Sequence, residues 1–517
     1  MRTFLTRVIR PCTAVTLWLV AVAPLAAQTG ALNATAGAFE LRFDARAFAA
    51  PFSGDVLVAF ATSGEPRKAL HGWFNAPPVL RFAVTDAQPG SALTLEFDDA
   101  VAHHPSDWSV VAPKAWRVQA IARRSRTGRL AGQDEGDVYS SIADITYDPG
   151  AEAAVRLELA TVVAARPPLE SERVKFFEFV SPALSEFHGF EYRLRAGVLL
   201  PHNYGEETSY PVVYSVTGFG GTDEDIRGWE RRVAPGSPLE NCIVVVPDAS
   251  NRYGHSVFCD SASIGPWGHA LVLEFIPALE AEFGGAGAEH RYVTGVSSGG
   301  WSSFWLQVTY PEAFAGCWSH VPDPIDFHDF QGINLYDPLP DGSPRNMYVD
   351  EHGARRPLAR RGDEVLMTYE DFVRREHVLN PGGQIRSFEA TFGGLGKDDT
   401  PQRVFDVETG VIDHVAASAW KPYDLANTLL TRWDELRPRL AGKLHVFAGE
   451  VDTFYLEGAV ERFRSAAEQQ GLLEDMQVEV IPGMAHALHG PGQAAMEKTI
   501  QERWQARQPR AAGAKAN

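Results

Sequence analysis

A glycine-flanked serine stands between a strand-like and a helix-like segment of this chain and limits the folds that the chain can adopt. The segment Arg291-Tyr-Val-Thr294 is typical of a buried β-strand, and Trp301-Ser-Ser-Phe-Trp-Leu-Gln307 is typical of a helix. Between them lies Gly295-Val-Ser-Ser-Gly299, a Gly-x-Ser-x-Gly pattern. Glycines two residues before and after the serine let a strand and a helix approach closely around a sharp turn. The pattern therefore predicts that Ser297 is a nucleophile projecting from the end of a sheet.

The chain around this motif alternates between strand-like and helix-like segments. Residues 211–216 and 242–246 are apolar on both faces, as in the central strands of a covered parallel sheet. Residues 271–283 carry apolar side chains at helical spacing. We therefore predict an α/β fold over residues 173–507, an α/β-hydrolase core with a mostly parallel sheet. The alternation is lost from about residue 326 to 440, which predicts a lid-like insertion.

The preceding part of the chain has a different pattern. Residues 39–43, 93–97 and 155–159 alternate apolar and polar side chains, as strands with one buried face do. We predict that residues 36–163 form an N-terminal all-β domain, an antiparallel sandwich of immunoglobulin-like type. Residues 164–172 contain Pro167-Pro168 and are expected to be a linker. The domain is interpreted as a carbohydrate-binding or substrate-positioning module, or as a structural appendage through which the chain forms an oligomer.

The first residues have the order of a secretory signal. Arg2, Arg7 and Arg10 precede an apolar stretch, and small residues stand before Gln28. The stretch is shorter than the roughly 20 residues that a membrane span needs. We predict a signal peptide over residues 1–27, no membrane insertion after cleavage, and a secreted or periplasmic protein.

The net charge of −19 argues against nucleic acid and anionic membranes as partners, since both require basic patches. Three cysteines follow the signal segment: Cys242, Cys259 and Cys317. In an oxidising compartment Cys242 and Cys259 are the closest candidates for a disulfide, and the alternative is three small buried side chains. No Cys/His cluster has zinc-ligand spacing, so the expectation is that neither a metal nor a cofactor is required.

A nucleophilic serine requires a base that an acid orients. In this fold the acid and then the base follow the serine along the chain. Residues 444–448 are strand-like and are followed by Gly449-Glu450-Val451-Asp452. We predict that Asp452 is the acid and that Glu450 is a solvated loop residue. A later strand-like run, 478–481, leads to His486, which we predict to be the base, with His489 as the alternative.

The oxyanion of a tetrahedral intermediate requires two amide donors. One is expected from Ser298, directly after the nucleophile. The glycine-rich segment Thr217-Gly-Phe-Gly-Gly221 follows a core strand and predicts a second donor, the amide of Phe219 or of Gly220. No Lys-Ser/Thr pair follows the segment, so it does not resemble a phosphate-binding loop.

Three segments resemble the Putative esterase family of α/β-hydrolases, which includes esterase D, feruloyl esterases and enterochelin esterases. They are residues 210–221, 291–300 and 445–455, and the resemblance extends from about Val174 to Arg507. The resemblance implies hydrolysis of carboxylic esters without a metal. It also implies Ser297, Asp452 and His486 as the triad, with Phe219 as an oxyanion donor. Members of the family commonly have histidine where this chain has Thr217.

Together these features predict an exported serine esterase that forms an acyl-enzyme. Its substrate is expected to be a small-molecule ester or a polysaccharide-linked one, with feruloyl, acetyl and siderophore-type esters all compatible with the sequence. One alternative is a serine peptidase or an acyltransferase, in which the same residues act on another substrate or transfer the acyl group to another acceptor. The other alternative is a non-catalytic carbohydrate-binding protein on a hydrolase scaffold.

Overall fold

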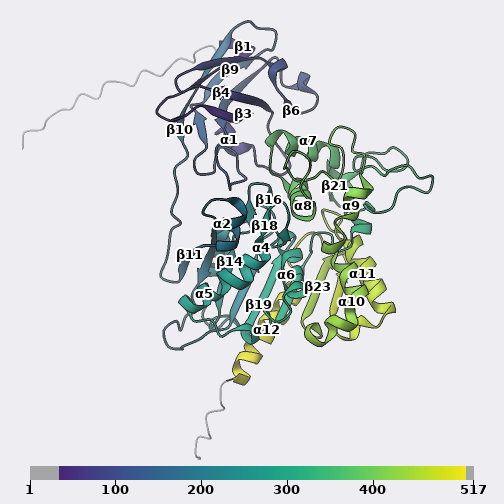
Figure 1. Cartoon of the computed structure of the whole chain (residues 1–517). Helices are drawn as coiled ribbons and strands as arrows, with labels where there is room; N and C mark the ends of the chain where they lie inside the picture. Colours follow the sequence, from purple (N-terminus) through teal and green to yellow (C-terminus); the bar gives the residue numbers. More distant parts are fainter. Residues whose placement is uncertain (1–33, 508–517) are drawn as a thin grey trace, which may run out of the picture.

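The computed structural model describes residues 34–507, so the predicted signal peptide, residues 1–27, lies outside the described residues. Figure 1 shows a group of N-terminal strands at one end of the molecule and a larger sheet flanked by helices at the other. No helix within residues 34–507 combines the length and the apolar character that crossing a bilayer would demand.

The N-terminal strands form one hydrogen-bonded sheet of ten strands. The strands are β1 (Ala34–Ala36), β2 (Ala38–Phe43), β3 (Phe52–Ala61), β4 (Val79–Ala87), β5 (Ala92–Leu95), β6 (Ala102–His104), β7 (Lys114–Ala122), β8 (Val138–Ser140), β9 (Ala143–Tyr147) and β10 (Ala154–Val162). A short helix, α1 (Pro66–Ala69), lies between β3 and β4. The pairs β2·β10 and β1·β9 are parallel, which corrects the expectation of a purely antiparallel arrangement.

This sheet bends over its own core. The ring centroids of Phe39 on β2 and Phe60 on β3 lie 6.1 Å apart, although β10, β8 and β7 separate these strands in the sheet. Such contact requires that the two halves of the sheet face each other. On β2 the buried side chains alternate with half-buried Glu40 and Arg42, as the sequence predicts. The immunoglobulin-like class stays a prediction.

The second sheet has eight strands in the order β11-β12-β14-β13-β19-β20-β23-β24. They are β11 (Val174–Val180), β12 (Arg193–Leu199), β13 (Val212–Val216), β14 (Ile243–Pro247), β19 (Arg291–Val296), β20 (Gly316–His320), β23 (Leu444–Gly449) and β24 (Gln477–Ile481). All pairs from β14 to β24 are parallel, and β11·β12 and β12·β14 are antiparallel. The predicted mixed α/β fold is therefore confirmed, and its sheet is mostly parallel.

Helices cover both faces of this sheet. They are α2 (Pro182–His188), α3 (Ile226–Arg232), α4 (Trp267–His269), α5 (Ile276–Phe283), α6 (Ser298–Thr309), α10 (Leu425–Leu440), α11 (Glu457–Gln469) and α12 (Gly490–Arg507). Val213 of β13 packs into a cluster with Ile226 and Met496, whereas its neighbour Tyr214 packs into the cluster that contains Leu279. Because successive side chains of a strand point to opposite faces, a strand covered on both sides must be apolar throughout.

The helix predicted over residues 271–283 begins with a π-helical segment, Ala270–Phe275. The amide of Ile276 donates to the carbonyl of Leu271, five residues earlier. Pro277 follows directly and has no amide hydrogen to continue an α-helical ladder into this segment, which is the physical reason for the wider turn.

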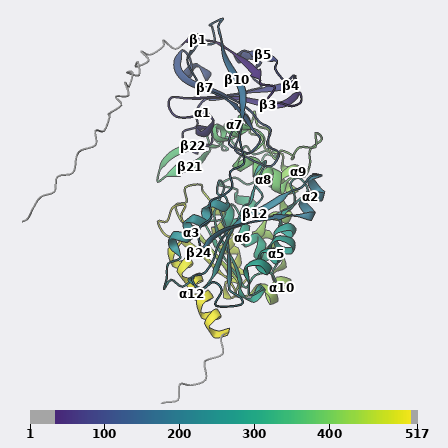
Figure 2. The same cartoon turned by 90° about the vertical axis from the view of Figure 1, so that its left-hand side faces the viewer.

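The segment between β20 and α10 contains β21 (Pro357–Arg361), β22 (Glu364–Thr368), α7 (Tyr369–Leu379), α8 (Gln384–Phe392) and α9 (His414–Ser418). Helix α7 packs against β4 and β6 of the N-terminal sheet, and α8 packs against the two-residue strands β16 (Gly254–His255) and β17 (Asp260–Ser261). Figures 1 and 2 both show α7 and α8 between the two sheets. Helix α10, by contrast, packs against α6 and α11, so the predicted range 326–440 contains both an interdomain part and a helix of the core layer.

The three cysteines of the described residues are buried and free, with no bond between Cys242 and Cys259. Burial raises the pKa of each thiol above its ordinary value, so these side chains are unreactive.

Candidate active site

Ser297 occupies the turn between β19 and α6 with φ 60° and ψ −126°. A residue other than glycine rarely adopts such a positive φ. Ser297 does so because the surrounding structure fixes the turn. A Cβ atom on Gly299 would overlap the carbonyl oxygen of Val216 on the adjacent strand, and one on Gly295 would overlap the carbonyl of Gly299. Both glycines of the motif are therefore required by close backbone approach.

His486 and Asp452 lie together, as the sequence predicts. His486 Nδ1 is 2.8 Å from Asp452 Oδ2. Asp452 is fully buried and also accepts a 2.8 Å hydrogen bond from the amide of Phe454. This pairing favours a proton on Nδ1, which leaves Nε2 of the imidazole free to accept a proton.

The two alternative residues have other environments. Glu450 is exposed and accepts a hydrogen bond of 2.9 Å from the amide of Gly483, so it joins the ends of β23 and β24. His489 lies against Phe447, with ring centroids 4.8 Å apart, and is not among the residues that line the cavity at Ser297.

Ser297 and His486 both line one cavity of about 250 Å³. The polar lining also includes Asp323, Gln331 and Gln384. The rest of the lining is mainly apolar and comes from segments far apart in the chain; it includes Trp73, Phe219, Leu358, Phe372, Phe388 and Phe454. A space of this size and character accommodates an apolar group next to the serine hydroxyl.

The predicted oxyanion segment reaches the same cavity through Gly218 and Phe219. Gly220 has φ 101°, and its carbonyl accepts a 2.7 Å hydrogen bond from Arg129 Nη2 of the N-terminal region. Ser298 is the first residue of α6, so its amide is one of the donors that a helix leaves without an intrahelical acceptor.

A buried histidine that the sequence analysis missed braces this segment. His255 Nδ1 accepts a 3.0 Å hydrogen bond from the amide of Val257, so Nε2 carries the proton and donates to the carbonyl of Thr217 at 3.1 Å. Burial lowers the pKa of His255 to about 4, which keeps the ring neutral. Nothing in its local sequence marks it, because its partner lies 38 residues earlier.

Asp323 is a second residue that the sequence analysis missed. It follows β20, whose carboxyl end meets the same sheet edge as the turn at Ser297. Ser297 Oγ lies 3.5 Å from Asp323 Oδ1, and Ser298 Oγ donates to Oδ2 at 2.5 Å. Gln384 Nε2 of α8 donates to Oδ2 at 3.2 Å. Burial raises the pKa of this carboxyl to about 6, while His486 and the two serines act in the opposite direction.

The raised pKa of Asp323 has a consequence for stability. The folded pKa of about 6 exceeds the ordinary value of 3.8 for an aspartate, so ionisation of Asp323 destabilises the fold above pH 6, and this cost disappears as pH falls from about 6 to about 4. Since one pKa unit corresponds to 1.36 kcal/mol, we expect Asp323→Asn to raise the free energy of unfolding by about 1–3 kcal/mol at pH 8. The measurement is denaturant unfolding between pH 4 and pH 8.

Exposed Asp363 provides the control, since Asp363→Asn removes a carboxylate with no buried partner. The titratable groups that act on Asp323 are His486 and Asp452, and both remain in the variant. A difference between wild type and Asp323→Asn that stays constant from pH 4 to pH 8 would contradict the assignment.

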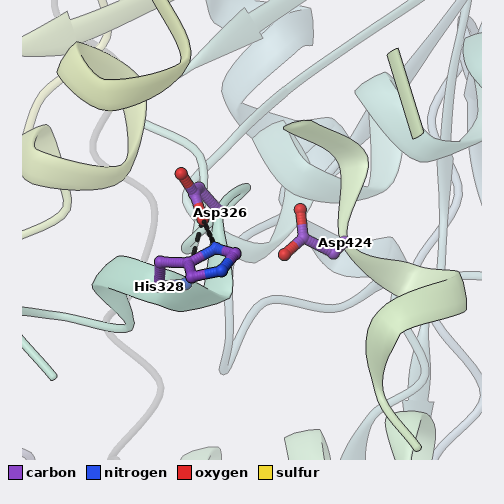
Figure 3. A group of neighbouring side chains, drawn as sticks. All are labelled: Asp326, His328 and Asp424. Atoms are coloured by element: carbon purple, nitrogen blue, oxygen red, sulfur yellow. Dashed lines mark hydrogen bonds and ion pairs between the residues drawn. The ribbon is translucent and has the colours of Figure 1, made fainter. Parts of the chain in front are cut away.

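One group of side chains among the described residues has metal-ligand spacing: Asp326, His328 and Asp424. Figure 3 shows His328 beside Asp326, with Nδ1 2.9 Å from Oδ1, and Asp424 opposite them. Asp326 Oδ2 also pairs with Arg462 Nε at 3.1 Å. Asp424 accepts hydrogen bonds from the amides of Phe327 and Asn427, and therefore caps α10. Protein donors occupy these carboxylates, so the group is interpreted as structural.

Comparison with solved structures finds many matches at low sequence identity. A ferulic acid esterase is 14% identical, with 64% of this chain and 98% of that chain covered and a TM-score of 0.38. The S-formylglutathione hydrolase of Agrobacterium tumefaciens is 15% identical, with 64% and 93% covered and a TM-score of 0.35. FphF, a fluorophosphonate-binding serine hydrolase of Staphylococcus aureus, is 12% identical, with 64% and 97% covered and a TM-score of 0.35.

A search of curated protein sequences gives no significant match. The family model described as "Putative esterase" matches residues 188–507, which is more than half of the chain and falls within the segment of the predicted resemblance. The chain therefore belongs to the Putative esterase family of hydrolases.

Proposed function

We propose that this protein is an exported serine esterase with an α/β-hydrolase core, and that Ser297, His486 and Asp452 are its catalytic triad. One observation carries the proposal: a strained serine and a carboxylate-paired imidazole line the same apolar cavity. Membership of an esterase family supports the same reaction class.

In this mechanism His486 Nε2 accepts the proton of Ser297 as the hydroxyl oxygen attacks the ester carbonyl. The amides of Ser298 and Phe219 donate to the oxyanion of the tetrahedral intermediate. The protonated imidazole then donates to the leaving alcohol, and the acyl group stays on Ser297. His486 next takes a proton from a water molecule, whose oxygen attacks the acyl carbonyl. The imidazolium then returns this proton to Ser297 Oγ as the bond between the acyl group and the serine breaks and the acid leaves.

The test is hydrolysis of p-nitrophenyl acetate and p-nitrophenyl butyrate by the purified chain, with a peptide p-nitroanilide as the comparison. An esterase releases nitrophenol much faster than nitroaniline. Preferential release of nitroaniline would favour the peptidase, and product analysis with added alcohols would detect an acyltransferase. Absence of all turnover, together with no labelling by a fluorophosphonate, would leave the non-catalytic binding protein.

Export is part of the proposal and has a separate test. N-terminal sequencing of the protein recovered from outside the cytoplasmic membrane is expected to begin at Gln28. Small-molecule and polysaccharide-linked esters, including feruloyl, acetyl and siderophore-type esters, are the substrates to compare. Binding to plant polysaccharides by the N-terminal domain would support a carbohydrate role for that domain.

Asp452→Asn is expected to lower kcat by roughly 10⁴-fold, because an amide in place of the carboxylate stabilises the wrong imidazole tautomer. The side chain keeps its size, so the buried site remains filled. Steady-state kinetics with p-nitrophenyl acetate measures the effect, and Glu450→Gln is the matched control on the same loop. A greater loss in Glu450→Gln than in Asp452→Asn would reverse the assignment of the acid.

A further inference from the structure

We propose that Trp73 of the N-terminal domain is a specificity-determining residue of the active site, where it binds the apolar group of the ester. The inference rests on the proposed function of Ser297. It gives the N-terminal domain a direct part in substrate recognition, so that residues 173–507 alone would lack one wall of the site.

The first observation is the position of Trp73 in the cavity. Trp73 and Phe74 belong to the loop between α1 and β4, and both line the cavity that contains Ser297 and His486. Phe74 is about half exposed, at 47%, whereas Trp73 is partly buried. Trp73 is therefore positioned to cover a ligand from the side of the N-terminal sheet.

The second observation is the set of rings around Trp73. Its ring stacks on Phe372 of α7, with centroids 5.3 Å apart and an interplanar angle of 13°. It meets Phe219 of the oxyanion segment edge-on, with centroids 5.9 Å apart, and is tilted by 48° against Phe454 at 5.5 Å. Phe454 in turn lies edge-on to His486 at 4.9 Å. The indole therefore contacts the ring of Phe219, the proposed oxyanion donor, and that of Phe454, the aromatic neighbour of the proposed base.

The third observation is that the loop is held in place by the insertion. Arg375 of α7 is buried, and its Nη1 donates to the carbonyls of Gly72 at 2.9 Å and Trp73 at 2.8 Å. In the opposite direction, Arg123 of the N-terminal domain donates to the carbonyls of Leu379 and Asn380 at the end of α7. Buried Arg375 and half-buried Arg123 thus fix both ends of the contact, so the indole is preorganised and loses little entropy when a ligand binds.

The fourth observation concerns the oxyanion segment. Arg129 of the N-terminal domain donates to the carbonyl of Gly220 and lies over the ring of Phe219, 5.3 Å from its centroid. The N-terminal domain thus touches both the apolar wall and the segment proposed to hold the oxyanion. A domain that served only as a remote appendage would have neither contact.

The experiment compares esters that carry small and large apolar groups as substrates of the full-length chain. The acyl arm uses p-nitrophenyl acetate and p-nitrophenyl 3-phenylpropanoate, and the alcohol arm uses ethyl acetate and benzyl acetate. Loss of a buried aromatic contact is expected to lower kcat/KM of Trp73→Ala about 10- to 100-fold for the larger ester of one arm, mainly through KM, with little change for the small ester. The arm in which kcat/KM falls for the larger ester shows whether the acid part or the alcohol part of the ester contacts Trp73.

Trp73→Phe is expected to keep most of the activity on the larger ester that Trp73→Ala loses, since an aromatic ring still lines the cavity at this position. Trp504→Ala is the matched control, because it removes a tryptophan from α12, at the opposite end of the molecule from the N-terminal sheet (Figure 1). If Trp73→Ala fails to fold, Trp73→Leu retains part of the apolar side chain without an aromatic ring and decides the question in the same way.

Equal losses for small and large esters in both arms, or no loss in either, would overturn the inference. The proposed function fails separately, when the wild-type chain hydrolyses none of the four esters. The two failures are therefore distinguishable in one set of measurements.

Discussion

Ser297→Ala is expected to lower kcat for p-nitrophenyl acetate by roughly 10⁶-fold, because removal of the nucleophile of a serine hydrolase abolishes the acyl-enzyme route. The substitution deletes one oxygen from a turn that glycines and the adjacent strand already fix. We therefore expect no loss of stability. The variant also loses the 3.5 Å contact between Ser297 Oγ and buried Asp323, which is expected to change Tm only slightly. Stopped assays at high enzyme concentration measure the residual rate, and Tm is measured in parallel.

The control is Ser302→Ala, on the same helix. Ser302 is buried and donates to the carbonyl of Ser298 at 2.6 Å, but it does not line the cavity. A fluorophosphonate is expected to label wild type and Ser302→Ala and to leave Ser297→Ala unlabelled. Turnover by Ser297→Ala within tenfold of wild type would rule out Ser297 as the nucleophile.

His486→Ala is expected to have an effect of similar size, also about 10⁶-fold in kcat, since nucleophile and base act as one unit. The imidazole of His486 is the one that pairs with Asp452 at 2.8 Å and lines the cavity. Its removal leaves the Asp452 carboxylate buried without this partner, so a moderate fall in Tm is expected as well. Kinetics on p-nitrophenyl acetate and thermal unfolding measure the two effects.

His489→Ala tests the alternative base, which lies three residues after His486 in the chain. Its ring packs on Phe447 outside the cavity, so we expect turnover close to that of wild type and a small loss of stability. The double variant His486→Ala/His489→Ala is expected to be no less active than His486→Ala. A larger loss of kcat in His489→Ala than in His486→Ala would transfer the role of base to His489.

Much of the architecture could be predicted because it depends on patterns within short segments. The apolar runs at 211–216 and 242–246 correspond to β13 and β14, and the alternation at 39–43 corresponds to β2. Successive side chains of a strand point to opposite faces, so the pattern of apolar residues shows whether one face or both faces are buried. The turn at Ser297 was equally local, because two glycines and a serine determine how closely β19 and α6 approach.

Features that depend on pairing across the chain could not be predicted in this way. The parallel contact of β2 with β10 joins segments more than a hundred residues apart, and the alternation within each strand is the same for either direction. The π-helical start of the helix at Ala270–Phe275 was also missed, since apolar spacing does not report a change of hydrogen-bond register.

Local patterns in the chain were enough to predict the mixed α/β fold, the family, and the candidates for nucleophile, acid and base in their chain order. The neighbours of those candidates emerged only in the folded chain: His486 rather than His489 beside Asp452, Asp323 beside Ser297, and Trp73 at the cavity. Strand and turn formation depends on neighbouring residues, whereas these contacts join side chains that follow different strands. Such contacts exist only after both sheets have packed, and they leave no periodic signal in the chain.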